Sequence, residues 1–198
     1  MKRWACTILG IAVGAGASLG LCLTVLRQGT AGRRGAQVTP QDSVKPPTIN
    51  GLQVTLATSQ PEYQLGQPMV VTVTFKNVAA RQQDIILYAD LGGRVVLGEN
   101  LLVCGKHEDG SDIPVLVMRP SLPVRVRIPL LRDSWCGFTH TLKELEPSKP
   151  GLCTLRAVYA ASLSDYGATS KAAVQLGGYC WTGQVESNPV MVRVAESR

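Results

Sequence analysis

The segment Val71-Thr72-Val73-Thr74-Phe75-Lys76-Asn77 decides the fold class of this chain. Its apolar residues alternate with threonine and lysine, and this period of two is typical of a β-strand with one buried and one solvated face. Leu52, Val54 and Leu56 repeat the alternation upstream. The Gly/Pro-punctuated stretch 60–68 lies between the two segments and predicts a turn.

Working outward, the same pattern predicts about eight or nine strands and no long helix. Further strands are expected at 85–88, 100–105, 113–118, 124–128, 138–145, 152–160 and 189–194. Arg125 and Arg127 are expected on a solvated strand face, and Gly110 and Gly151 are expected to form tight turns. The sequence therefore predicts an all-β antiparallel two-sheet sandwich over residues 51–198.

Three motifs carry a family resemblance. They are Tyr63-x-x-Gly66-x-Pro68 before the 71–77 strand, Lys149-Pro150-Gly151 before Leu155-Arg156-Ala157-Val158-Tyr159, and Trp181-Thr182-Gly183 before Ser187-Asn188-Pro189. Together they resemble immunoglobulin-like β-sandwich domains of secreted or envelope bacterial proteins, and more loosely macroglobulin-type domains and BsuPI-type proteinase inhibitors. The resemblance implies an immunoglobulin-like sandwich without catalytic residues. This chain departs from the family pattern by an insert at 162–179. Trp181 is expected to plug the end of the sandwich, and Asn188-Pro189 to start an edge strand.

Residues 4–26 carry no charge and follow Lys2 and Arg3. A helix of this length spans about 34 Å, which is enough to cross a bilayer. We expect a single N-terminal apolar helix over residues 1–26, as either a retained signal anchor or a cleaved signal peptide. Residues 27–50 are rich in glycine and proline and are expected to form a flexible linker.

The net charge of +6 belongs mostly to the N-terminal part of the chain. Residues 1–50 hold six basic side chains and one acid, which leaves the rest of the chain at +1. The basic flanks fit anionic lipid headgroups, and nucleic acid is not an expected partner. Basic residues on both flanks leave the orientation open, although the cysteines favour a domain outside the cytoplasm, membrane-anchored through residues 4–26 or secreted.

Four of the six cysteines lie in the predicted sandwich, at positions 104, 136, 153 and 180. An even number permits disulfides, and four cysteines allow three pairings. The preferred pairing is Cys104–Cys136 with Cys153–Cys180, and reduced, buried thiols are the alternative. Zinc is not expected, because separations of 32, 17 and 27 residues do not fit a zinc site.

The two histidines do not predict a catalytic site. His107 is expected in a solvated turn, and His140 on a strand surface about 13 Å from Cys136. The sequence has no nucleophile elbow, phosphate loop or zinc-protease motif. We therefore expect a non-enzymatic protein without catalytic, metal or cofactor site and without a small-molecule substrate.

Two functions remain open on the sequence. The first is a module for protein interaction or envelope structure, with an unknown protein partner in the envelope. The second is a proteinase inhibitor that presents the 162–179 loop, with Tyr166, Lys171 and Tyr179 as possible contact residues. In the second case, a Cys153–Cys180 bridge would preorganise the loop for binding.

Overall fold

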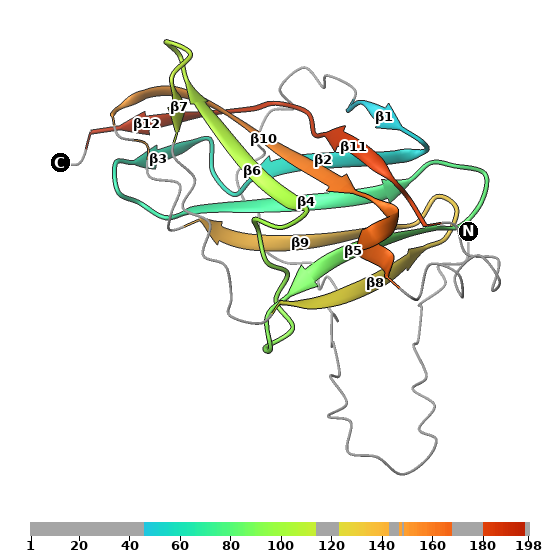
Figure 1. The fold of residues 1–198 in the computed structure, drawn as a ribbon. Coiled ribbons are helices and arrows are strands. Elements are labelled where there is room, and N and C mark those ends of the chain that lie inside the picture. The colour runs from blue at the N-terminus through green and yellow to red at the C-terminus, as the bar shows by residue number, and fades with distance from the viewer. Residues whose placement is uncertain (1–45, 114–122, 143–146, 148, 168–179, 197–198) are drawn as a thin grey trace, which may run out of the picture. The chain divides into compact units, whose positions relative to one another are not determined.

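The computed structural model describes residues 46–113, 123–142, 147, 149–167 and 180–196. Within them the chain is all-β, with one short 3-10 helix (Figure 1). The elements are β1 (Thr48–Ile49), β2 (Leu52–Thr58), β3 (Glu62–Gln64), β4 (Met69–Asn77), β5 (Gln83–Ala89), β6 (Leu101–His107), β7 (Asp112–Ile113), β8 (Val124–Leu130), β9 (Trp135–Leu142), β10 (Gly151–Ala161), η1 (Leu163–Tyr166), β11 (Gly183–Glu186) and β12 (Val190–Ala195). No helix of the described residues is long and apolar enough to cross a membrane, and the predicted segment 4–26 lies outside them.

The strands form three sheets, two of which are large. The first sheet has the order β1-β2-β4-β9, and the second has the order β3-β12-β10-β6-β7, with β11 also paired to β10. Strands β5 and β8 pair as a separate ribbon. The strand pairs are antiparallel except β12–β3, which is parallel, so the prediction of a wholly antiparallel fold needs this correction.

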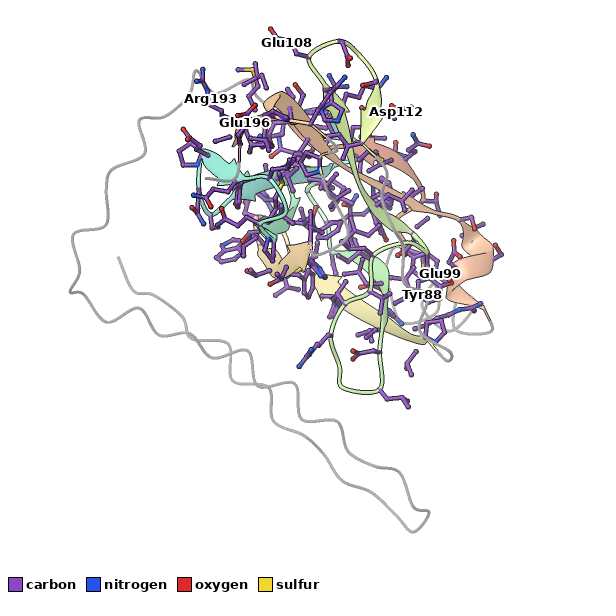
Figure 2. The ribbon with its side chains drawn as sticks, turned by 90° about the vertical axis from the view of Figure 1, so that its left-hand side faces the viewer. Tyr88, Glu99, Glu108, Asp112, Arg193 and Glu196 are labelled. Atoms are coloured by element: carbon purple, nitrogen blue, oxygen red, sulfur yellow. The ribbon has the colours of Figure 1, made fainter. Side chains whose placement is uncertain are left out.

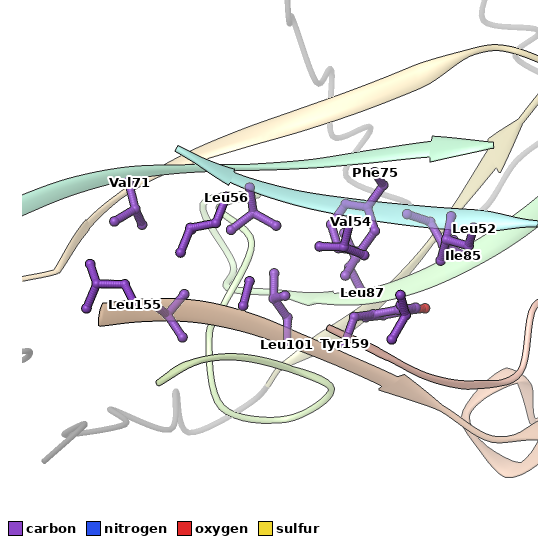
Figure 3. Close-up of a cluster of buried hydrophobic side chains, with 14 of the residues drawn as sticks. Leu52, Val54, Leu56, Val71, Phe75, Ile85, Leu87, Leu101, Leu155 and Tyr159 are labelled. Atoms are coloured by element: carbon purple, nitrogen blue, oxygen red, sulfur yellow. The ribbon is translucent and has the colours of Figure 1, made fainter. Parts of the chain in front are cut away.

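The core lies between the inner faces of the two large sheets. Leu52, Val54 and Leu56 of β2 point inward beside Val71 and Phe75 of β4, as the alternation predicts. Figure 3 shows them facing Leu101, Leu155 and Tyr159 of the second sheet. Each of these side chains is at most 3% exposed. Burying one contributes on the order of 1.5–3 kcal/mol, which makes this layer the main source of stability.

Two polar residues tie the second sheet to its neighbours: Tyr159 bonds to β5 of the separate ribbon, and Asn188 bonds to β2 of the first sheet. The Tyr159 hydroxyl donates to the carbonyl oxygen of Ile86 at 3.0 Å and accepts from its amide at 3.1 Å. The Asn188 side chain accepts from the Leu56 amide at 3.1 Å and donates to the Leu56 carbonyl at 3.2 Å. Asn188 therefore ties the entry to β12 onto β2. The prediction that Asn188-Pro189 starts an edge strand is wrong, because β12 lies between β3 and β10.

The structure has three short strands that the pattern did not predict. Strand β3 lies inside the predicted turn 60–68, β11 follows Trp181, and β1 lies at the end of the predicted linker. Each has four residues or fewer, so its alternation is too short to be recognised, and only the pairing partner defines it. The turn at Gly110 is confirmed, with φ +82° and a hydrogen bond of 2.9 Å from its amide to the His107 carbonyl, and Gly151 has φ +138° as the first residue of β10.

Candidate interaction surface

The four cysteines of the domain are free thiols in the structure. Cys104 is exposed on the outer face of β6, whereas Cys136 packs against the core from β9 in the other large sheet. A strand layer separates the two side chains, so the predicted Cys104–Cys136 bridge is wrong for this fold. The cysteine pattern had indicated only that four thiols were available for pairing.

The predicted Cys153–Cys180 bridge is wrong as well. Cys153 lies near the start of β10, opposite His107 and Val192. Cys180 precedes Gly183, which pairs with Ala161 at the other end of β10. Eight residues of strand separate Cys153 from Ala161, about 26 Å, far beyond the span of a disulfide.

Burial of the Cys136 thiol predicts a loss of stability at alkaline pH. Desolvation raises its pKa from 9.0 to about 12, so the folded state retains a proton that the unfolded state releases above pH 9. The free energy of unfolding should therefore fall as pH rises from 9 to 12, by up to about 1.4 kcal/mol per pH unit from this thiol. We expect Cys136→Ala to reduce this slope in urea titrations at pH 8, 9 and 10 under reducing conditions. Equal slopes in the two proteins would contradict the prediction.

The structure brings His107 and Cys153 together. The Cys153 Sγ atom lies 3.6 Å from His107 Nδ1, and the two residues are 0% and 5% exposed. His107 is thus not in a solvated turn, because β6 continues to position 107 and turns its ring inward. Only the cross-strand register of β6 and β10 reveals this pair, because 46 residues separate the two in sequence.

His140 also faces inward, so the prediction of a surface position is wrong. It follows the inward-facing Cys136 and Phe138 on β9, and desolvation lowers its pKa. Its Nε2 atom is buried and has no hydrogen-bond partner among the described residues. A neutral imidazole is the form that this environment favours.

Tyr166 is buried at 2% exposure and cannot contact a protease, which corrects its assignment to an exposed loop. Its hydroxyl lies 2.7 Å from the carbonyl oxygens of both Asp84 and Trp181. The Trp181 amide donates to the same Asp84 carbonyl at 2.9 Å. The chain thus leaves and re-enters the described structure beside Asp84. The other two residues of the predicted loop, Lys171 and Tyr179, lie outside the described residues.

A shallow hollow of about 480 Å³ lies on the outer face of the second sheet, where β3, β12 and β10 run side by side. Leu152 lies opposite Arg193, and Arg193 lies beside Glu62 in the parallel register. The Glu108 amide donates to the Leu152 carbonyl at 3.0 Å and brings the β6–β7 turn to the rim. The lining residues are Glu62, Glu108, Gly151, Leu152, Arg193, Val194 and Ala195.

The charged side chains that line this hollow are Glu62, Glu108 and Arg193. Among the described residues, the ion pairs lie elsewhere, and none involves Glu62, Glu108 or Arg193. Figure 2 shows Glu108, Arg193 and Glu196 at one end of the domain. The glutamates outnumber the arginine around the apolar side chain of Leu152, which is 37% exposed. Such a surface suits a segment that carries a basic group next to an apolar one.

The described residues hold no group of three or more His, Cys, Asp or Glu side chains that could bind a metal ion. Strands rather than loops place Leu152, Arg193 and Glu62, so their relative positions are set by the register of the sheet. Sequence reasoning missed the hollow because its residues come from segments up to 133 positions apart, from Glu62 to Ala195.

No protein family and no curated protein sequence matches this chain. Among solved structures, the sporulation control protein Spo0M of Bacillus subtilis is similar over 76% of this chain and 51% of its own, with 16% identity and a TM-score of 0.40. A β-glucosidase of Listeria innocua, in complex with glucose, is similar over 73% of this chain and 16% of its own, with 14% identity and a TM-score of 0.32. This chain thus spans about half the length of the first protein and less than a fifth of the second. Likenesses at this level carry no argument about function.

Proposed function

We propose that this protein is a non-enzymatic interaction module of the cell envelope or exterior, built on an immunoglobulin-like sandwich. The observation that carries the proposal is the hollow, in which Glu62, Glu108 and Arg193 make no ion pair with a described residue around the half-exposed Leu152. Unpaired charges around an apolar side chain on a rigid sheet provide both specificity and buried area for a protein partner. Residues 4–26 hold the protein at the membrane, or direct its secretion.

Site-specific photo-crosslinking tests the partner proposal. A photoreactive amino acid replaces Leu152 in the full-length protein, expressed in the cells that naturally make it. We expect a discrete protein adduct that is lost when Glu62→Lys and Glu108→Lys are added, because both carboxylates then become cations. The matched control is the same probe at Leu91, which is 73% exposed on the turn after β5. The proposal fails if Leu152 yields no adduct, or yields the same adduct as Leu91.

The exposed thiol of Cys104 tests the location of the domain. Cys104 is exposed, whereas Cys153 and Cys180 are buried and Cys136 packs against the core. A membrane-impermeant maleimide should therefore label Cys104 in intact cells without prior reduction, at a slow rate because burial and the nearby carboxylates raise its pKa. Peptide mapping identifies the labelled site. Labelling of Cys104 only after lysis would place the domain in the cytoplasm.

A proteinase inhibitor remains the second candidate. It is favoured by the convergence of the two ends of the insert beside Asp84, because fixed ends lower the entropic cost of binding a protease. The hydrogen bonds of Tyr166 and Trp181 to the Asp84 carbonyl would then hold the two ends of the insert together, which is the role that the predicted disulfide was expected to have. An inhibition screen of the full-length protein against serine and cysteine proteases, with Lys171→Ala as the paired variant, tests this candidate. No inhibition at micromolar concentration removes it.

A further inference from the structure

The outer face of the first sheet is an array of hydroxyl groups. The inward alternation of β2, β4 and β9 leaves their other side chains on one solvated surface, in rows set by the strand register. The rows are Gln53–Lys76–Trp135, Thr55–Thr74–Gly137, Ala57–Thr72–Thr139 and Val70–Thr141. Thr72 and Thr139 share a hydrogen bond of 3.1 Å between their hydroxyls, and Gln53 donates to Thr48 at 2.9 Å.

Trp135 lies at one end of this face and is 68% exposed. Its Cζ3 atom is 3.7 Å from the point where a Cβ of residue 137 would stand. The indole therefore lies along its own strand over Gly137 rather than standing out from the sheet. A side chain at position 137 would lie 3.2 Å from the Thr74 hydroxyl, so glycine keeps a shallow space open between Trp135 and Thr74.

The outer face of the first sheet carries fewer charged side chains than the outer face of the second sheet. Lys76 is the only charged side chain that the described strands β2, β4 and β9 present on it. The outer face of the second sheet, in contrast, carries Lys106, Arg156, Glu186 and Arg193. A polyanion or an anionic membrane surface gains little from a nearly neutral face, so the charge pattern fits an uncharged ligand.

The size of the face argues for a narrow ligand. Positions 135 to 141 span about 20 Å along β9, and β2 to β9 span roughly 10 Å, or about 15 Å with side chains. The resulting area of roughly 300 Å² is well below the ~800 Å² per partner of a stable protein interface. A second copy of this chain, or another folded protein, would bury too little surface here.

We propose that the outer face of the first sheet binds an uncharged polysaccharide chain, with Trp135 stacking on a sugar ring and the threonine hydroxyls bonding to the sugar hydroxyls. A pyranose ring offers an apolar C–H face to the indole, and aromatic residues dominate the energetics of such contacts. Threonine hydroxyls donate and accept hydrogen bonds, as sugar hydroxyls do. Trp135, Thr74 and Thr139 are thus the residues that contact the glycan. The hollow on the second sheet is a separate surface.

Retention on neutral glycans tests this proposal. The full-length protein is kept in a polyoxyethylene detergent, because a maltoside headgroup would compete, and is mixed with cellulose, chitin and an insoluble β-1,3-glucan. We expect binding to at least one of them, unchanged between 50 and 500 mM salt because no ion pairs are involved. Trp135→Ala should weaken this binding at least tenfold, and Trp135→Phe should retain part of it.

Two further sets of variants keep the test independent of folding. Thr74→Val and Thr139→Val remove hydroxyls but preserve shape and strand preference, and each should weaken binding severalfold. Glu62→Lys with Glu108→Lys alters the hollow and should leave glycan binding unchanged. Retention on none of the three glycans overturns the proposal, as does retention that Trp135→Ala leaves unchanged. Salt-sensitive binding to phosphatidylglycerol vesicles that Trp135→Ala abolishes, in place of binding to the glycans, assigns the face to a lipid surface and also overturns the proposal, whereas vesicle binding that Trp135→Ala leaves unchanged belongs to the basic flanks.

Discussion

Replacement of Trp181 with alanine is expected to lower the free energy of unfolding by about 4 kcal/mol. The Trp181 side chain is 0% exposed, and its ring stacks on Tyr159 with centroids 5.1 Å apart. Its indole nitrogen donates to the Ile49 carbonyl oxygen at 3.0 Å, which holds β1 against the end of the sandwich. Truncation leaves a large cavity and an unpaired carbonyl, in a domain whose total stability is about 5–15 kcal/mol.

Thermal and urea unfolding followed by circular dichroism measure this effect. The melting temperature should fall by roughly 10 °C or more. Trp135→Ala is the matched control, because the same side chain is 68% exposed there and its loss should change stability by less than about 1 kcal/mol. Equal destabilisation by the two substitutions would show that Trp181 does not act as the plug of the sandwich.

The second large effect is expected at the buried ion pair of Asp84 and Arg127. The Asp84 side chain is 0% exposed and accepts from Arg127 Nε at 2.9 Å and from Gln82 at 3.0 Å. Asp84→Ala should cost about 3 kcal/mol, because it leaves the guanidinium of Arg127 without its partner. That cost lies at the lower end for buried pairs, since the Arg127 side chain is 32% exposed and can reach water.

A double-mutant cycle separates this pair from simple loss of packing. Asp84→Leu with Arg127→Met should be more stable than either single variant, because neither charge is then left alone in the interior. Arg132→Ala is the surface control, since its pair with Asp133 at 3.4 Å is about 70% exposed on both sides. It should change stability by less than about 1 kcal/mol. Strictly additive single effects in the cycle would contradict the assignment.

The ion pair also corrects the prediction for β8. Alternation placed Arg125 and Arg127 together on a solvated strand face, and Arg125 does lie exposed, 5.9 Å from the centroid of the Tyr88 ring. Arg127 instead reaches the buried Asp84 of the neighbouring strand β5. Periodicity indicates which face of a strand a residue occupies, whereas the neighbouring strand determines which side chains that residue contacts.

The sequence by itself determined the all-β class, most of the long strands and their inward faces. Alternation in 52–56 and 71–75 is a local property of the pleated chain, so β2 and β4 could be predicted with their buried residues. The positive φ angles at Gly110 and Gly151 were also predictable, because glycine adopts this local backbone conformation without steric cost. The sequence also indicated that Trp181 belongs in the interior.

Only the tertiary structure decided which residues meet. Cys153 lies near the start of β10 and Cys180 lies beyond its other end, His107 contacts Cys153, and Tyr166 is buried beside Asp84. The hollow and the outer face of the first sheet are likewise built from strands that are distant in sequence. Local periodicity specifies the face of each residue, but the register between strands depends on the packing of the whole core. That nonlocal register places Gly137, over which Trp135 lies, beside Thr74, and no pattern in the sequence had singled out Trp135.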